Sequence, residues 1–147
     1  MVSSKIKQAS IVLFYNNKDG SMLLQDRRKI SKFGEEYGLF GGSAEGEENG
    51  DETLKRELME ELGLDIQNAR LFESHVFFNE ELEESMKRNF FLAPIPDISK
   101  LKCHEGEMVI MKIKDCSQLK MMQGQLELLK KAHAYLIDEK IINPKNN

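Results

Sequence analysis

The sequence predicts an α/β or α+β fold, and two observations carry this prediction. Short stretches rich in β-branched and aromatic residues, bounded by turn residues, predict the strands of a sheet. Two further stretches, residues 53–62 and 117–142, have the composition and apolar spacing of helices. The order of these stretches leaves both fold classes open. At 147 residues the chain is expected to form a single domain, residues 1–147, with a core of its own.

The first elements of the chain are predicted to form a β-hairpin. Residues 6–15 are rich in β-branched and aromatic side chains, and the turn-forming sequence NNKDG follows them at residues 16–20. Residues 21–28 should therefore return as the second strand, in which alternate side chains face opposite ways. Arg27 and Arg28 then lie on opposite faces, so one of them is expected to point into a site. The other interpretation is a solvated strand end.

The central element is a helix over residues 53–62. Asn49 or Asp51 can cap its N-terminus, and Gly63 suits the left-handed position that ends a helix. One face is apolar and another is acidic, with Leu54, Leu58 and Leu62 on the first and Glu57, Glu60 and Glu61 on the second. Grouped carboxylate oxygens suit Mg²⁺ or Mn²⁺, whereas an ordinary solvated acidic face is the other interpretation of this helix.

Strands and loops are predicted to follow the helix, before a last helix. The expected strands lie at residues 70–79, 88–95 and 108–113, with loops at 80–84 and 96–104. Apolar residues then recur at spacings of three or four over residues 117–142. The mixed charges of that segment favour a helix packed on the sheet over one lying on a membrane surface.

Composition narrows the classes of partner. A formal net charge of −4 argues against a nucleic-acid polymer, though it does not exclude a nucleotide. No apolar run approaches the length that spans a bilayer, so no membrane partner is expected. The N-terminus lacks an apolar signal core, and Cys103 and Cys116 do not make a disulfide framework. These observations predict a cytoplasmic protein.

Residues 42–64 carry a motif with fixed spacing. Its positions are Gly42, five residues, Glu48, seven residues, Arg56-Glu57-Leu58, one residue, Glu60-Glu61, one residue and Gly63-Leu64. In this region the chain resembles the Nudix hydrolases, whose signature GX5EX7REUXEEXGU, with U apolar, it matches at every defined position. The resemblance implies an α/β/α sandwich with a mixed β-sheet. It also implies hydrolysis of a phosphoanhydride bond in a nucleoside diphosphate linked to another moiety.

The same resemblance implies a site that depends on Mg²⁺, with Mn²⁺ as the alternative. Divalent cations neutralise phosphate oxygens, orient the attacking water and lower its pKa. The implied metal ligands are the Gly41 carbonyl and the carboxylates of Glu57, Glu60, Glu61 and Glu105. Glu60 and Glu105 are the two choices of general base, and Glu107 is a second choice for the acidic residue outside the motif. Arg56 is expected to brace Glu48 or Glu57, the other interpretation being a surface pair with Glu60.

The substrate is expected to be a small-molecule nucleotide. Similar proteins often bind phosphate with an arginine near the end of the second strand, which implies Arg27 or Arg28. The polar segment 29–36 should border the pocket, and Phe33, Tyr37 and Phe40 are candidates for stacking on a base, with a place in the core as the other interpretation. A homodimer is compatible with the resemblance.

Substrate subclass is approached by elimination. The downstream marks of hydrolases of ADP-ribose, diadenosine polyphosphates and NADH are absent from the window around residues 78–82. The first choice is therefore a nucleoside triphosphate, cleaved to the monophosphate and pyrophosphate. The alternatives are a hydrolase of a nucleotide sugar or another nucleoside diphosphate derivative, and a nucleotide-binding domain of this fold without catalysis.

Overall fold

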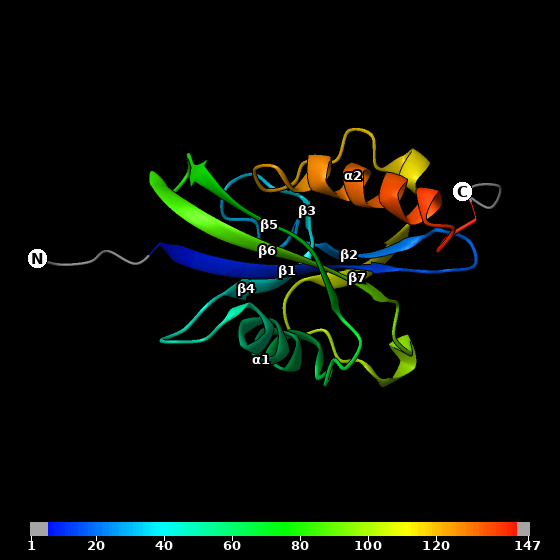
Figure 1. The fold of residues 1–147 in the computed structure, drawn as a ribbon, viewed down its shortest axis with the longest axis horizontal. Coiled ribbons are helices and arrows are strands. Elements are labelled where there is room, and N and C mark those ends of the chain that lie inside the picture. The colour runs from blue at the N-terminus through cyan, green and yellow to red at the C-terminus, as the bar shows by residue number, and fades with distance from the viewer. Residues whose placement is uncertain (1–5, 144–147) are drawn as a thin grey trace, which may run out of the picture.

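The computed structural model describes residues 6–143 and shows a mixed β-sheet between two helices. Helix α1 (Gly50–Leu62) covers one face of the sheet and helix α2 (Gln125–Asp138) covers the other (Figure 1). The α/β/α sandwich that the resemblance implies is therefore confirmed. Neither helix in this part of the chain has the length and hydropathy needed to cross a membrane.

The sheet is built from seven strands among the described residues. Their bounds are β1 (Lys7–Tyr15), β2 (Met22–Asp26), β3 (Tyr37–Gly38), β4 (Phe40–Ser43), β5 (Arg70–Asn79), β6 (Glu84–Pro94) and β7 (Glu107–Met111). The order across the sheet is β3-β2-β1-β6-β5, while β4 pairs with β1 and β7 pairs with β2. Strands β1 and β6 run parallel and the other pairs are antiparallel, which makes the sheet mixed.

The N-terminal hairpin forms as predicted, with a shorter second strand. Backbone N–H groups of Asn16 and Gly20 donate to the carbonyls of Ser21 and Asn16, each at 2.8 Å, and close the turn. Strand β2 ends at Asp26, so Arg27 and Arg28 follow the strand rather than belong to it. Strand β1 is then flanked by β6 on one edge and by β2 and β4 on the other.

Asn49, one of the two predicted caps, caps helix α1, so the helix begins at Gly50 rather than at residue 53. The Asn49 side chain accepts from the N–H of Glu52, and the Glu52 carboxylate accepts from the N–H of Asn49, both at 2.9 Å. The helix ends at Gly63, whose φ of 64° is the left-handed conformation that the sequence predicts there. Both ends are therefore set by residues of the motif segment itself.

Alternate side chains of β1 enter two hydrophobic clusters, one under each helix. On the α1 side, Val12 packs with Phe40 and with the three leucines of the apolar helix face. On the α2 side, Ile11 packs with Phe90 and with Leu129. The leucine stripe thus anchors α1 to the sheet, and this leaves the carboxylates of α1 to face the loop before it.

The last helix is shorter than predicted, because residues 117–124 are not helical. The Lys120 carbonyl accepts from the N–H groups of Glu36 (2.7 Å) and Tyr37 (3.0 Å), and the Gln123 side chain bonds to the backbone of Phe78 and Glu80. These long-range bonds replace those that would continue the helix toward its N-terminus. Helix α2 starts only after Gly124, whose φ is 77°.

Candidate active site

The three carboxylates of α1 differ in exposure. Glu61 is buried, Glu57 is half-buried and Glu60 is exposed. The Gly41 N–H donates to the Glu61 carboxylate at 3.2 Å. Burial, followed by the nearby charges of Glu57 and Glu105, raises the pKa of Glu61 to about 8. The structure therefore gathers negative charge from α1 and from a distant loop around one buried carboxylate.

Arg56 connects the carboxylates of the motif. It donates to both oxygens of Glu48 (2.8 and 3.0 Å), to Glu57 (3.0 Å) and to Glu60 (3.2 Å), and also to the Ser43 carbonyl (2.8 Å). The guanidinium lowers the pKa of Glu48 to about 2, and Glu48 raises the pKa of Arg56 in return. Arg56 therefore makes the contacts expected from both interpretations: it holds Glu48 and Glu57, and it also pairs with Glu60.

Two glycines of β4, Gly41 and Gly42, lie where other groups approach the backbone closely. Gly41 has a φ of 137°, which side-chain-bearing residues rarely adopt, and a Cβ there would collide with the Ser10 carbonyl across the sheet. A Cβ on Gly42 would lie only 2.6 Å from either carboxylate oxygen of Glu57. Gly41 is therefore needed for the close contact of β4 with Ser10 of β1, and Gly42 for the close approach of the Glu57 carboxylate.

The loop after β6 brings Glu105 to the same place. Its carbonyl accepts from the Gln25 side chain at 2.9 Å and from the Cys103 thiol at 3.2 Å, which fixes the loop backbone against β2. The charge of Glu105 contributes to the raised pKa of Glu61. Glu107 instead pairs with Lys29 at 3.3 Å. Of the two acidic residues, Glu105 is the one that the structure brings to the α1 carboxylates.

The donor set fits a divalent cation that also binds substrate and water. No three acidic, histidine or cysteine side chains in residues 6–143 already form a ready-made cage for an ion. Mg²⁺ does not need one, because it keeps several waters and takes phosphate oxygens as ligands. The raised pKa of Glu61 and the close approach of the Glu57 carboxylate to Gly42 fit an added positive charge here. Glu57, Glu60 and Glu61 would hold it.

A cleft begins at the end of β4, at Gly41, Gly42 and Ser43, which are called the glycine loop from here on, and it extends over the α2 face of the sheet. It encloses about 210 Å³ and is lined from β1, β4, β5, β6 and the start of α2. Arg27 lines this cleft, whereas Arg28 lines a different hollow and pairs with Asp26 at 2.7 Å. Of the two arginines, Arg27 is therefore the one that lines the cleft.

Glu35 organises the loop between β2 and β3, and sequence reasoning missed it. Its carboxylate is 3% exposed and accepts from Nε of Arg27 (2.9 Å), the Ser31 hydroxyl (2.8 Å) and the N–H groups of Lys32 and Phe33 (3.1 and 2.9 Å). Burial opposes its ionisation, but these hydrogen bonds outweigh burial and lower its pKa to about 2. Glu35 thus holds Arg27 at the edge of the cleft.

The three aromatic candidates have different environments. Phe40 is fully buried, with its ring 6.3 Å from that of Phe14, so the prediction that it stacks on a base is wrong: core packing covers both faces. Tyr37 is half-buried under the guanidinium of Arg28, 5.5 Å from the ring centroid. Phe33 is 46% exposed and borders a second cavity of about 400 Å³.

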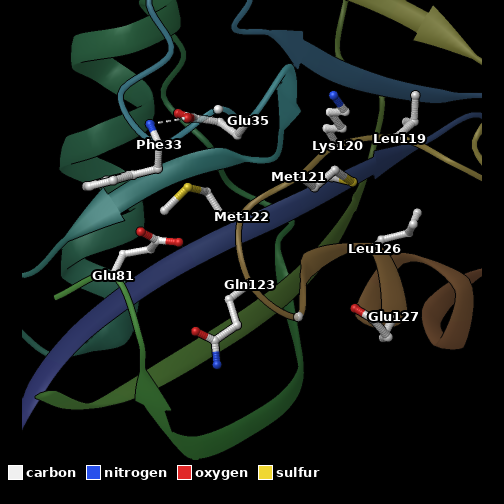
Figure 2. Close-up of a pocket in the computed structure, with 12 residues that line it drawn as sticks. Phe33, Glu35, Glu81, Leu119, Lys120, Met121, Met122, Gln123, Leu126 and Glu127 are labelled. Atoms are coloured by element: carbon white, nitrogen blue, oxygen red, sulfur yellow. Dashed lines mark hydrogen bonds between the residues drawn. The ribbon is translucent and has the colours of Figure 1, made fainter. Parts of the chain in front are cut away.

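This second cavity adjoins the cleft at Met122, which lines both. Figure 2 shows the bond from the Phe33 nitrogen to Glu35 and the Phe33 ring extending away from that carboxylate. The opposite wall comes from residues 119–124, the segment that was predicted to be helical. Among the three aromatic residues, Phe33 therefore remains the one with a ring accessible to a ligand.

Glu35→Gln is expected to lower the free energy of unfolding by about 1–3 kcal/mol at neutral pH, because it removes a buried charge from four donors. The folded pKa of Glu35, about 2, lies below its ordinary value of 4.5. The stabilisation is therefore complete above about pH 4.5 and is lost as the pH falls toward about 2. Urea unfolding of both proteins between about pH 7 and pH 3 measures this difference.

Glu36→Gln is the matched control, since its carboxylate is the neighbour of Glu35 in sequence and forms none of the loop bonds of Glu35. It should leave the free energy of unfolding nearly unchanged over the same range. A difference between wild type and Glu35→Gln that stays constant down to about pH 3 would contradict the assignment.

Comparisons with known proteins indicate one family and one fold. Residues 5–132 match the model of the NUDIX domain family. No curated protein matches the chain. Among solved structures, the E. coli ORF135 protein is 24% identical with a TM-score of 0.70, and the match covers 92% of this chain and 93% of that one.

Two further structures extend the fold comparison. The MutT NUDIX hydrolase from Burkholderia pseudomallei is 20% identical, with a TM-score of 0.69 and coverage of 86% of this chain and 98% of that one. The E. coli dihydroneopterin triphosphate pyrophosphohydrolase is 15% identical, with a TM-score of 0.71 and coverage of 87% and 95%. At these identities the structural likeness establishes the fold alone.

Proposed function

This chain belongs to the Nudix family and is an enzyme of the pyrophosphohydrolase type, and from that premise we propose that it hydrolyses a nucleoside triphosphate to the monophosphate and pyrophosphate. The observation that carries the proposal is the set of carboxylates held by Arg56, in which Glu57 lies against Gly42, a residue that lines the cleft. A polyphosphate placed there would meet grouped oxygen ligands at one end and Arg27 in the cleft wall.

The proposed roles follow from exposure and contacts. Glu57, Glu60 and Glu61, with the Gly41 carbonyl and Glu105, would hold Mg²⁺ or Mn²⁺. The bound cation would neutralise phosphate oxygens and lower the pKa of the attacking water.

Glu60 or Glu105, both exposed, would take the proton of that water as its oxygen attacks a phosphorus. The leaving group, either pyrophosphate or the monophosphate, would depart with the electrons of the broken P–O bond. Arg56 would keep Glu57 and Glu60 in orientation, a supporting role of the kind that usually changes metal affinity or activity when lost.

The setting of the reaction completes the proposal. The partner would be a small nucleotide rather than a nucleic-acid polymer, in line with the net charge of −4. Cys103 and Cys116 are both free, as expected of the reducing cytoplasm in which we place the enzyme.

A panel of nucleotides with Mg²⁺ tests the proposal by separating the products. Nucleoside triphosphates are expected to yield the monophosphate and pyrophosphate, with no turnover after chelation of the metal. Faster release of a sugar phosphate from nucleotide sugars would replace the triphosphate by that substrate class. Binding of nucleotides without hydrolysis of any of them would contradict the proposal.

A further inference from the structure

Arg88 of β6 is a buried cation in the wall of the cleft. The residue is 6% exposed, yet it lines the cavity that begins at the glycine loop. Its guanidinium carbon lies 4.1 Å from the ring centroid of Phe77 on β5, and its Nη2 donates to the Gln123 carbonyl at 2.7 Å. One face of the guanidinium is therefore packed against an aromatic ring, and one N–H donor is bonded to the segment that precedes α2.

No described carboxylate forms an ion pair with Arg88, unlike the other arginines near the site. Arg27 pairs with Glu35, Arg28 with Asp26 and Arg56 with the motif glutamates. Burial alone lowers the pKa of Arg88, to about 10. A buried charge without a partner costs free energy in the folded state, so a site that keeps one is expected to use it.

The register of the sheet places Arg88 two strands away from the side of the cleft that carries the motif. Arg88 is paired with Ala9 of β1, and Ala9 is paired with Ser43 of β4. Two strand spacings separate Arg88 from Ser43, about 10 Å along the sheet. A nucleotide with its phosphates beside the glycine loop would therefore extend its sugar and base toward Arg88.

The surroundings of Arg88 suit a nucleobase. The apolar side chains of Leu82, Met86 and Met122 line the same cavity, together with the amides of Asn79 and Gln125. A guanidinium carries five N–H donors and no acceptor, so its partner must offer acceptors. A keto oxygen is an acceptor, whereas the amino group that replaces it in adenine or cytosine is a donor.

We propose that Arg88 selects the base of the substrate by donating to a keto oxygen, O6 of a purine or O4 of a pyrimidine. In a purine the adjacent N7 offers a second acceptor, and arginine pairs with O6 and N7 together in a planar, bidentate arrangement. The inference rests on the proposed function, because it takes the phosphates to lie at the motif end. It assigns a preference for hypoxanthine, guanine, uracil or thymine over adenine and cytosine.

Binding of inosine and adenosine monophosphates tests this assignment without any need for hydrolysis. Their bases differ in the keto or amino group at position 6 and in the accompanying proton on N1, while N7, the sugar and the phosphate are the same. Calorimetric titration of the wild-type protein should give tighter binding of the inosine nucleotide by about 5- to 100-fold. Arg88→Met, which keeps an apolar stem over Phe77, should reduce this ratio to about one. Binding of adenosine monophosphate should change little.

Arg70→Met is the matched control. Arg70 lies on the neighbouring strand β5, and its guanidinium is 5.8 Å from the ring centroid of Tyr135, outside the cleft. It should keep the wild-type ratio. Circular dichroism and urea unfolding of Arg88→Met should show a folded protein, since removing an unpaired buried charge relieves its desolvation.

Several results would overturn the assignment. Equal binding of the two monophosphates by the wild type, or no binding of either, would exclude recognition of the base by Arg88. An equal loss for both in Arg88→Met would indicate a structural role, and weaker binding of inorganic pyrophosphate by that variant would indicate a phosphate contact. Each of these leaves the proposed hydrolysis to be judged separately by pyrophosphate release in the nucleotide panel.

Discussion

Glu60→Gln is expected to lower kcat for nucleotide hydrolysis by about two to four orders of magnitude while the protein stays folded. The substitution removes a carboxylate that we propose as a metal ligand or as the base for the attacking water. Its side chain is 58% exposed and contributes only a 3.2 Å contact with Arg56, so the core does not depend on it. Release of pyrophosphate with saturating Mg²⁺ measures the loss, and urea unfolding verifies the fold.

Asp51→Asn is the control for Glu60→Gln, because Asp51 is an exposed carboxylate in the first turn of the same helix. It should retain activity within about twofold of wild type. Activity of Glu60→Gln in that same range would defeat the assignment of Glu60.

Glu105→Gln, measured beside Glu60→Gln, distinguishes the residue that binds the metal from the residue that acts as the general base. The substitution that lowers kcat without weakening Mn²⁺ binding marks the base, since a lost ligand weakens the binding as well.

Arg56→Met is expected to reduce metal affinity or activity by about 10- to 100-fold and to lower the Tm. The guanidinium supplies hydrogen bonds to Glu48, Glu57 and Glu60 and to the Ser43 carbonyl, and its loss leaves three carboxylates close together without a cation. Arg56→Lys should recover only part of the loss, because an ammonium carries the charge but lacks the planar fork that binds Glu48 through both oxygens.

Lys55→Met is the matched control for Arg56→Met. Lys55 is the preceding residue of α1 and is exposed, so its removal changes the net charge equally without touching the brace. Mn²⁺ titration and thermal unfolding of all four proteins make the comparison. Arg56→Met with wild-type affinity for Mn²⁺ and wild-type activity would show that the hydrogen bonds of Arg56 to the motif glutamates are dispensable.

The motif segment could be predicted from sequence because its determinants are local. Capping by Asn49, termination at Gly63 and the separation of leucines from carboxylates all depend on residues within a few turns of α1. The hydrogen bonds of Arg56 to the motif glutamates are nearly as local, since Arg56 reaches Glu48 eight residues earlier and Glu60 four residues later. Helical periodicity brings Arg56 and Glu60 to one side of the helix, and Glu48 lies directly before the cap residue Asn49.

The wall of the second cavity that lies opposite Phe33 could not be predicted, because its determinants are distant in sequence. Residues 117–124 have helical spacing, yet the carbonyl of Lys120 and the side chain of Gln123 bond to the segments that follow β2 and β5. Phe40 is in the core only because β4 pairs with β1 across the α1 face. The environment of Arg88 depends on β1 lying beside β6, a parallel pairing between strands far apart in the chain.

Anomalous scattering from Mn²⁺ in crystals with a non-hydrolysable nucleoside triphosphate tests the metal site most directly. The expected result is Mn²⁺ coordinated by at least two of Glu57, Glu60 and Glu61 and by phosphate oxygens, with the polyphosphate beside Gly41 and Gly42. A polyphosphate bound in the cleft, with those three carboxylates free of metal at saturating Mn²⁺, would contradict the central claim that they hold the cation against the substrate.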